Sequence, residues 1–100
     1  MKTEYVRDIV KEPSPTDARL IEALKSLIEV LSYAYVIDWI PEQGLTIYTV
    51  VVPDRQVAIV EIADVGTFEA SLLSLNEFKH HNPKLSAERR RKLATIESMI

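Results

Sequence analysis

The sequence predicts a small α+β domain in which helices pack on a three-stranded antiparallel sheet. Apolar residues recur at helical spacing on both sides of a central segment that is rich in β-branched and aromatic residues. Turn residues divide this segment at short intervals, which favours an antiparallel meander. The predicted order is α-α-β-β-β-α-α, in one domain that spans residues 1–100.

Two helices are predicted ahead of the sheet. Apolar residues have helical spacing over residues 3–11, and Pro13 ends this short helix. Ser14 is a suitable N-cap for a second helix over residues 15–33, with Asp17 at the position that a capping box gives to an acidic side chain. The apolar stripe of the second helix consists of Leu20, Ile21, Leu24, Leu27, Ile28 and Leu31.

Three strands are predicted over residues 34–40, 45–52 and 56–63, with turns at residues 41–44 and 53–55. In the strands of a sheet with one solvent-exposed face, apolar residues alternate with polar residues. Here both faces of the second and third strands are apolar. Both faces therefore need a cover, either from helices of the same chain or from another chain.

Two helices are predicted after the sheet. Thr67 is a suitable cap for a helix over residues 67–79, and Ser86 for a last helix whose apolar side includes Leu93, Ile96, Met99 and Ile100. We expect the helices at 15–33 and 67–79 to cover one face of the sheet. The first and last helices then fold over the other face or reach a partner.

Composition excludes several classes. The chain has no cysteine, so it forms no disulfide, and this favours a cytoplasmic setting. The N-terminal residues have no signal-peptide pattern, and no apolar stretch reaches the length of a membrane helix. The net charge of −3 argues against a nucleic-acid footprint over the whole domain. With two Asn and two Gln, the composition is equally compatible with a thermophilic and a mesophilic source.

Catalytic and metal-binding patterns are sparse. Glu77, His80 and His81 are neighbours on a helix surface, but a zinc site needs three or four ligands with supporting groups, and no second His or Cys cluster exists. No serine has the glycine-flanked context of a nucleophile, and there is no glycine-rich phosphate loop. We therefore predict no catalytic residue, no metal and no cofactor, and we favour a non-enzymatic chain.

The run Arg89, Arg90, Arg91 and Lys92 begins the last predicted helix, where positive charge opposes the helix dipole. One interpretation is contact with nucleic acid or an acidic partner. The other is a solvated face with intrahelical pairing, such as Glu88 with Lys92. Four consecutive helical residues spread over about 300°, so they cannot all face one ligand.

Residues 49–63, within 19–79, resemble the core hairpin of the PD-(D/E)xK nuclease superfamily, which has a helix bearing Glu, three strands and a further helix. Glu61 stands at the position of that family's acidic residue, and Glu22 at that of the helix Glu. Thr49 replaces the family's Asp and Ala63 its Lys. A metal-dependent nuclease needs two carboxylates and a cation near the attacking water. The resemblance therefore implies an inactive relative that retains nucleic-acid binding.

We favour a non-catalytic interaction module that forms a homodimer through apolar surface of the sheet or the terminal helices. The alternative is a nucleic-acid-associated protein that uses residues 89–92 and has an inactive nuclease-like fold. Large amphipathic side chains suit an interface. The candidate interface residues are Tyr35, Trp39, Tyr48, Leu93, Ile96 and Ile100.

Overall fold

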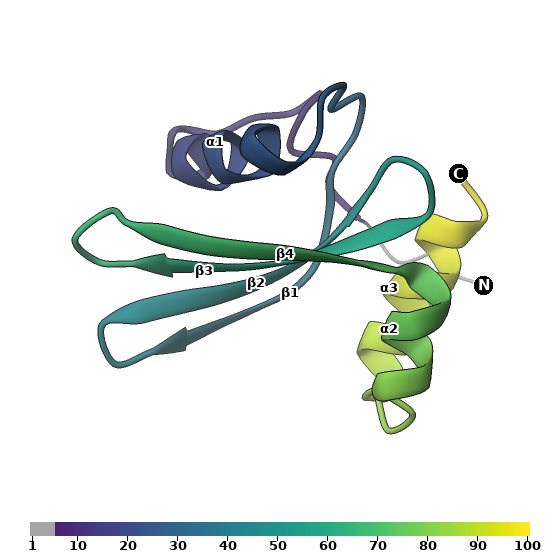
Figure 1. Cartoon of the computed structure of the whole chain (residues 1–100). Helices are drawn as coiled ribbons and strands as arrows, with labels where there is room; N and C mark the ends of the chain where they lie inside the picture. The colour runs from purple at the N-terminus through teal and green to yellow at the C-terminus, as the bar shows by residue number, and fades with distance from the viewer. Residues whose placement is uncertain (1–5) are drawn as a thin grey trace.

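The computed structural model describes residues 6–100 and confirms the α+β class (Figure 1). A single antiparallel sheet has the order β1-β2-β3-β4, so it contains four strands where three were predicted. The strands are β1 (Tyr35–Glu42), β2 (Leu45–Val52), β3 (Gln56–Ala63) and β4 (Phe68–Ser74). The helices are the short 3-10 helix η1 (Pro15–Asp17), α1 (Ala18–Leu27), α2 (Leu75–His81) and α3 (Ala87–Glu97).

The central hairpin forms as predicted, with the bounds of β2 and β3 unchanged. Val51 lies opposite Val57, and Leu45 opposite Ala63, without a register shift between these pairs. The first strand also forms, but it runs two residues further than predicted, to Glu42. A β-bulge interrupts its pairing with β2 between Val36 and Asp38.

The predicted helix over residues 67–79 is wrong in its first half, which forms β4. Phe68, Leu72 and Leu75 have helical spacing, which is the origin of the prediction. The same segment also alternates, because Glu69 and Ser71 are exposed while Phe68, Ala70 and Leu72 are half-buried. Pairing with the edge of β3 selects the strand. The helix begins after Ser74 rather than after Thr67.

The N-terminal half also differs from prediction. Residues 3–5 of the predicted first helix lie outside the described residues, and from residue 6 to 11 the chain forms a bridge and a turn instead of a helix. Asp8 explains the loss of the predicted helix. Its carboxylate accepts hydrogen bonds from backbone N–H groups, and its backbone forms an isolated β-bridge with Tyr35. The second helix ends at Leu27 rather than near residue 33, since the chain is already extended at Ile28.

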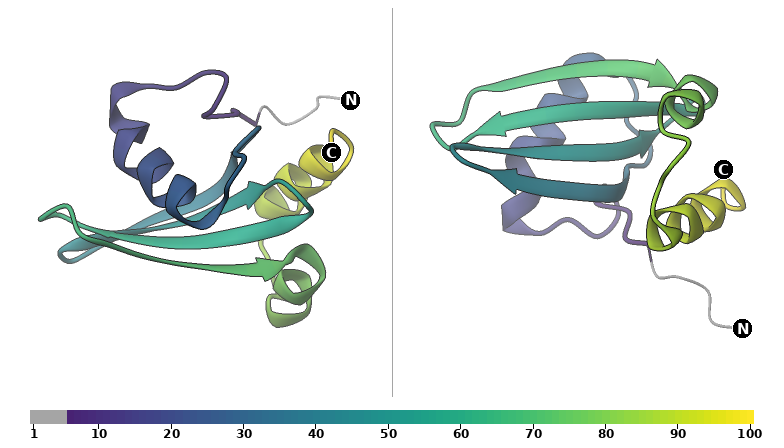
Figure 2. Two further views of the ribbon diagram at one scale, coloured as in Figure 1. Left: turned by 45° about the horizontal axis from the view of Figure 1, so that its top comes forward. Right: turned by 90° about the horizontal axis from the view of Figure 1, so that it is seen from below.

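Two cores lie on opposite faces of the sheet (Figure 2). Helix α1 covers one face together with extended segments on both sides of it, and Leu20 and Leu24 pack there with Val50 and Val60. Helices α2 and α3 cover only one end of the other face. The expectation that the two longer predicted helices share one face is therefore wrong, because residues 68–74 join the sheet. The second core consists of Ile37, Val51, Val57, Leu75, Phe78, Leu93 and Ile96.

Among residues 6–100, no helix is long and apolar enough to cross a membrane.

Candidate interaction surfaces

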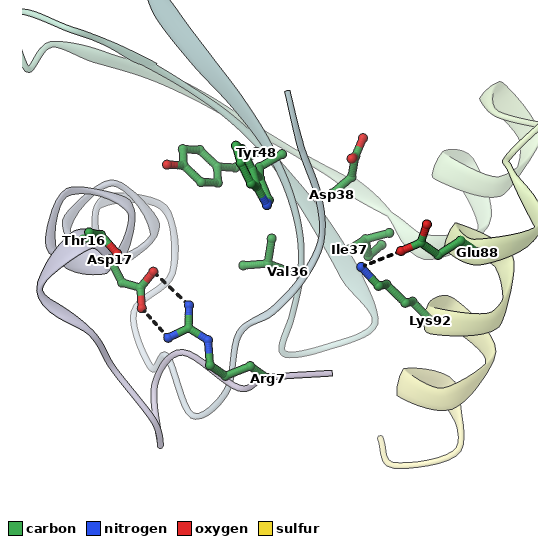
Figure 3. A pocket seen from close by; sticks show the side chains of 10 residues that line it. Arg7, Thr16, Asp17, Val36, Ile37, Asp38, Tyr48, Glu88 and Lys92 are labelled. Atoms are coloured by element: carbon green, nitrogen blue, oxygen red, sulfur yellow. Dashed lines mark hydrogen bonds and ion pairs between the residues drawn. The ribbon is translucent and has the colours of Figure 1, made fainter. Parts of the chain in front are cut away.

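A cleft of about 590 Å³ lies beside β1, between the N-terminal segment and α3 (Figure 3). Residues from β1 and β2, including Trp39 and Tyr48, line it together with polar groups from both flanks. On each side of the cleft, the charged side chains form an ion pair with one another. Arg7 donates to Asp17, with Nη1 at 2.9 Å from Oδ2 and Nη2 at 3.2 Å from Oδ1. Across the cleft, Nζ of Lys92 lies 3.5 Å from Oε1 of Glu88.

Several hydrogen bonds hold the carboxylate of Asp17 in place. Burial by itself raises the pKa of its carboxyl, but hydrogen bonds from the Ser14 backbone, the Arg7 guanidinium and the Ser14 hydroxyl outweigh it, so the pKa lies below its ordinary value of 3.8. The ionised carboxylate is therefore a structural anchor between η1 and the N-terminal segment. It accepts these bonds rather than offering a basic oxygen to a substrate.

The basic run does not form one patch. Arg89 points to the sheet, where its Nη2 lies 2.9 Å from Oδ2 of Asp38 on β1. Lys92 pairs with Glu88 on its own helix, as one of the two interpretations of the sequence expects. Arg90 lines a small hollow of about 280 Å³ between α2 and α3, and Arg91 is exposed. Arg89, Arg90 and Lys92 therefore face different neighbours, and contact of this run with nucleic acid stays a prediction.

The candidate interface residues divide into two groups. Leu93 and Ile96 are buried in the second core, where they hold α3 against the sheet. Tyr35, Tyr48 and Ile100 are half-buried, and Trp39 is 60% exposed. Of this set, Trp39 is the large apolar side chain that the single chain leaves most open to solvent.

At the end of the sheet away from α2 and α3, no described helix lies over the face opposite α1 (Figure 2). Direct pairing places Ile40 beside Ile47, and Ile47 beside Glu61. Ile40 is 41% exposed, and Ile47 and Ile59 are half-buried. Glu61 also lies opposite Glu69, and like charges in this position weaken a cross-strand pair.

The residues of the nuclease-like resemblance are spread over the two faces. Glu61 is on the face opposite to its neighbours Val60 and Ile62, which pack toward α1. Glu22 is on α1 and is exposed. The structure therefore does not bring Glu22 and Glu61 together, and the resemblance stays a prediction.

The histidine pair lies at the C-terminal end of α2. The two rings of His80 and His81 are 5.9 Å apart between centroids. Glu77 is engaged elsewhere, because it forms a reciprocal cap with Ser74 at the start of the helix. Hydrogen bonds from the Ser74 backbone and hydroxyl lower the pKa of Glu77. Over residues 6–100, no group of three or more His, Cys, Asp or Glu side chains is placed to hold a metal ion.

The sheet edge formed by β4 is the surface that the sequence prediction missed. Its signal in the sequence is the alternation of polar Glu69 and Ser71 with apolar Phe68, Ala70 and Leu72, a segment whose apolar residues also fit a helix. As the last strand in the sheet, β4 pairs within residues 6–100 on its β3 side alone.

No protein-family model, curated protein or solved structure matches this chain.

Proposed function

We propose that the chain is a non-catalytic interaction module that forms a homodimer through its sheet. One observation carries the proposal: the four-stranded sheet has more apolar and unpaired surface than the helices of the chain cover. Trp39 and Ile40 are exposed on β1, and α2 and α3 lie over one end of the face opposite α1. A second copy is the simplest cover for such a surface, since most soluble assemblies are symmetric homo-oligomers.

The electrostatics support a binding role over a catalytic one. In the cleft beside β1, Arg7 is paired with Asp17, and Lys92 with Glu88. Paired charges of this kind position chain segments, whereas general acid–base work requires a group poised to exchange a proton with a substrate. The proposal therefore assigns no cofactor and no reaction. The lack of cysteine is the support for placing the protein in the cytoplasm.

Light scattering coupled to size-exclusion chromatography tests the homodimer. We expect a mass twice that of the 11.4 kDa chain, approached progressively as the loaded concentration rises. A mass equal to one chain at every concentration up to the millimolar range contradicts the proposal.

The alternative proposal is nucleic-acid binding through the start of α3, where Arg90 and Arg91 are exposed. Binding carried by these charges should weaken steeply with salt. We expect Arg90→Ala with Arg91→Ala to abolish it, while Lys84→Ala, an exposed cation ahead of α3, leaves it unchanged. Titration of labelled duplex and single-stranded DNA and RNA at low ionic strength provides the measurement, and no salt-sensitive binding in any titration rejects this alternative.

A further inference from the structure

The hydrogen-bonding pattern of β4 shows which of its backbone groups point away from the sheet. The N–H of Leu75 donates to the carbonyl of Arg55, and the N–H of Ala63 donates to the carbonyl of Thr67, each at 2.8 Å. Both pairs fit the register of β3 and β4. Since hydrogen-bonded and non-hydrogen-bonded pairs alternate in an antiparallel ladder, every second residue of β4 faces outward. These outward residues are Phe68, Ala70 and Leu72, with Ser74 at the end.

Ser74 is already satisfied, because its backbone N–H donates to Oε1 of Glu77 at 3.0 Å. The free part of the edge therefore runs from Phe68 to Leu72. Among residues 6–100, no other backbone segment pairs with it.

The two edges of the sheet differ in how they are protected. Natural proteins block edge pairing with bulges, prolines and charges. The β1 edge has all three, namely the bulge between Val36 and Asp38, the backbone nitrogen of Pro41, which carries no hydrogen, and Asp38 held by Arg89. It is also paired at one end through the bridge from Asp8 to Tyr35. The β4 edge has no proline, no lysine and no register shift against β3, and its one charged side chain is Glu69.

We infer that β4 pairs antiparallel with β4 of a second copy, with Ala70 on the twofold axis, so that two sheets join into one. This inference rests on the proposed self-association and identifies the surface that carries it. In this register Ala70 lies opposite the partner's Ala70, and Phe68 lies opposite the partner's Leu72. Each of these pairs joins outward-facing residues and exchanges two backbone hydrogen bonds.

Charge repulsion and the availability of backbone N–H groups favour this register over the two registers in which the axis moves by one residue. Moving the axis to Glu69 places that carboxylate directly opposite the partner's Glu69, and like charges in this position are destabilising. Moving the axis to Ser71 pairs Phe68 with the partner's Ser74, whose N–H is already used. With Ala70 on the axis, Glu69 lies opposite the partner's Ser71, whose hydroxyl can donate to the carboxylate.

The same register completes the apolar face under α1. Phe68 and Leu72 are half-buried and already pack against the first core. In the dimer, Phe68 of each copy lies beside Leu72 of the other copy. This buries one aromatic–aliphatic cross-strand pair on each side of the axis. The small side chain of Ala70 allows the two strands to meet beneath the helices.

A charge exchange at Ser71 tests the register, because Ser71 is exposed and the register places it opposite the partner's Glu69. We expect Ser71→Lys to tighten dimerisation and Ser71→Glu to weaken it. The twofold axis makes each change act twice, so the dissociation constant should shift by about 2- to 30-fold in each direction. Ser32→Lys and Ser32→Glu are matched controls, since they change net charge equally at an exposed serine before β1. Equal effects at positions 71 and 32 overturn the register.

Disulfide trapping tests the edge itself, and the chain has no cysteine to interfere. Residues in a hydrogen-bonded antiparallel pair have Cα atoms about 5.5 Å apart, within the range that a disulfide spans. We expect Ala70→Cys to form a covalent dimer that reduction reverses, and Trp39→Cys on the β1 edge to form none. Trapping through position 39 but not 70 overturns the β4 assignment and leaves self-association intact. A monomeric wild-type chain instead rejects the proposed function, so the two failures are distinguishable.

Discussion

Replacing Asp8 by alanine removes the acceptor for two backbone N–H groups where the N-terminal segment meets β1. The side chain is buried, and its Oδ1 accepts from Val10 N–H and from Ala34 N–H, each at 3.0 Å. Ala34 is fully buried, so its N–H has no route to water once the carboxylate is gone. Oδ2 accepts no hydrogen bond among the described residues and lies 3.9 Å from Nζ of Lys11.

The expected loss follows from these two groups. A buried donor left without a partner costs about 1–3 kcal/mol, and the higher part of this range applies to Ala34. Val10 is only half-buried, so water replaces part of its bond. The total is about 2–4 kcal/mol, out of about 5–15 kcal/mol for a typical domain. For a chain of this size, we expect the melting temperature to fall by about 10–25 °C.

Urea unfolding followed by circular dichroism measures the loss. Asp8→Asn keeps one side-chain oxygen as an acceptor, so its loss should lie between those of the wild type and Asp8→Ala. Asp64→Ala, an exposed aspartate in the β3–β4 turn, is the matched control and should change stability by less than about 0.5 kcal/mol. If Asp8→Ala unfolds at the same midpoint as the control, the two N–H groups are not the source of stability. If Asp8→Asn is as unstable as Asp8→Ala, the negative charge matters and the acceptor geometry does not.

Three further predictions concern the packing of the helices. Ser74→Ala removes the cap of α2 and should cost about 1 kcal/mol in thermal unfolding; an unchanged midpoint contradicts the cap. Ile96→Ala opens the second core and should cost about 2–5 kcal/mol in urea unfolding, whereas a loss below 1 kcal/mol would mean that α3 contributes little to the fold. Asp17 has a lowered pKa in the folded state, so its contribution is complete above the unfolded pKa of about 4 and is lost as the pH falls through the folded pKa. Unfolding free energies between about pH 5 and 2 should therefore fall more steeply for the wild type than for Asp17→Asn, and parallel curves would contradict the assignment.

The central hairpin is predictable because several local signals agree there. Residues 45–52 and 56–63 are rich in β-branched residues, and Pro53 starts a turn between them. The structure keeps both bounds, and it holds Asp54 and Arg55 in the left-handed region within that turn. The last helix is predictable for a similar reason, since Ser86 both precedes the apolar stripe and accepts from Arg89 N–H.

The errors occur where distant contacts decide the local structure. Asp8 lies in a segment with helical spacing, but its bond to Ala34, 26 residues away, selects a turn. Ile28 and Leu31 continue the apolar stripe of α1, yet they reach the first core from an extended connection. In both cases the apolar positions from residue 6 onward are buried or half-buried as expected, whereas the backbone conformation at these positions differs from the predicted helix. Propensity is a weak prior against such tertiary contacts.

The candidate surface was missed for the same reason, and this error changes the functional argument. A helix over residues 67–79 would have helped to cover the sheet, and the second apolar face would then have been the main reason to expect a partner. As β4, residues 68–74 cover no face and instead extend the sheet by one strand, whose outer edge pairs with no other segment of the described chain. An apolar face can be covered by any apolar partner, because burial is non-directional. A strand edge has a direction and a two-residue repeat, so it specifies its partner's register as well as its presence.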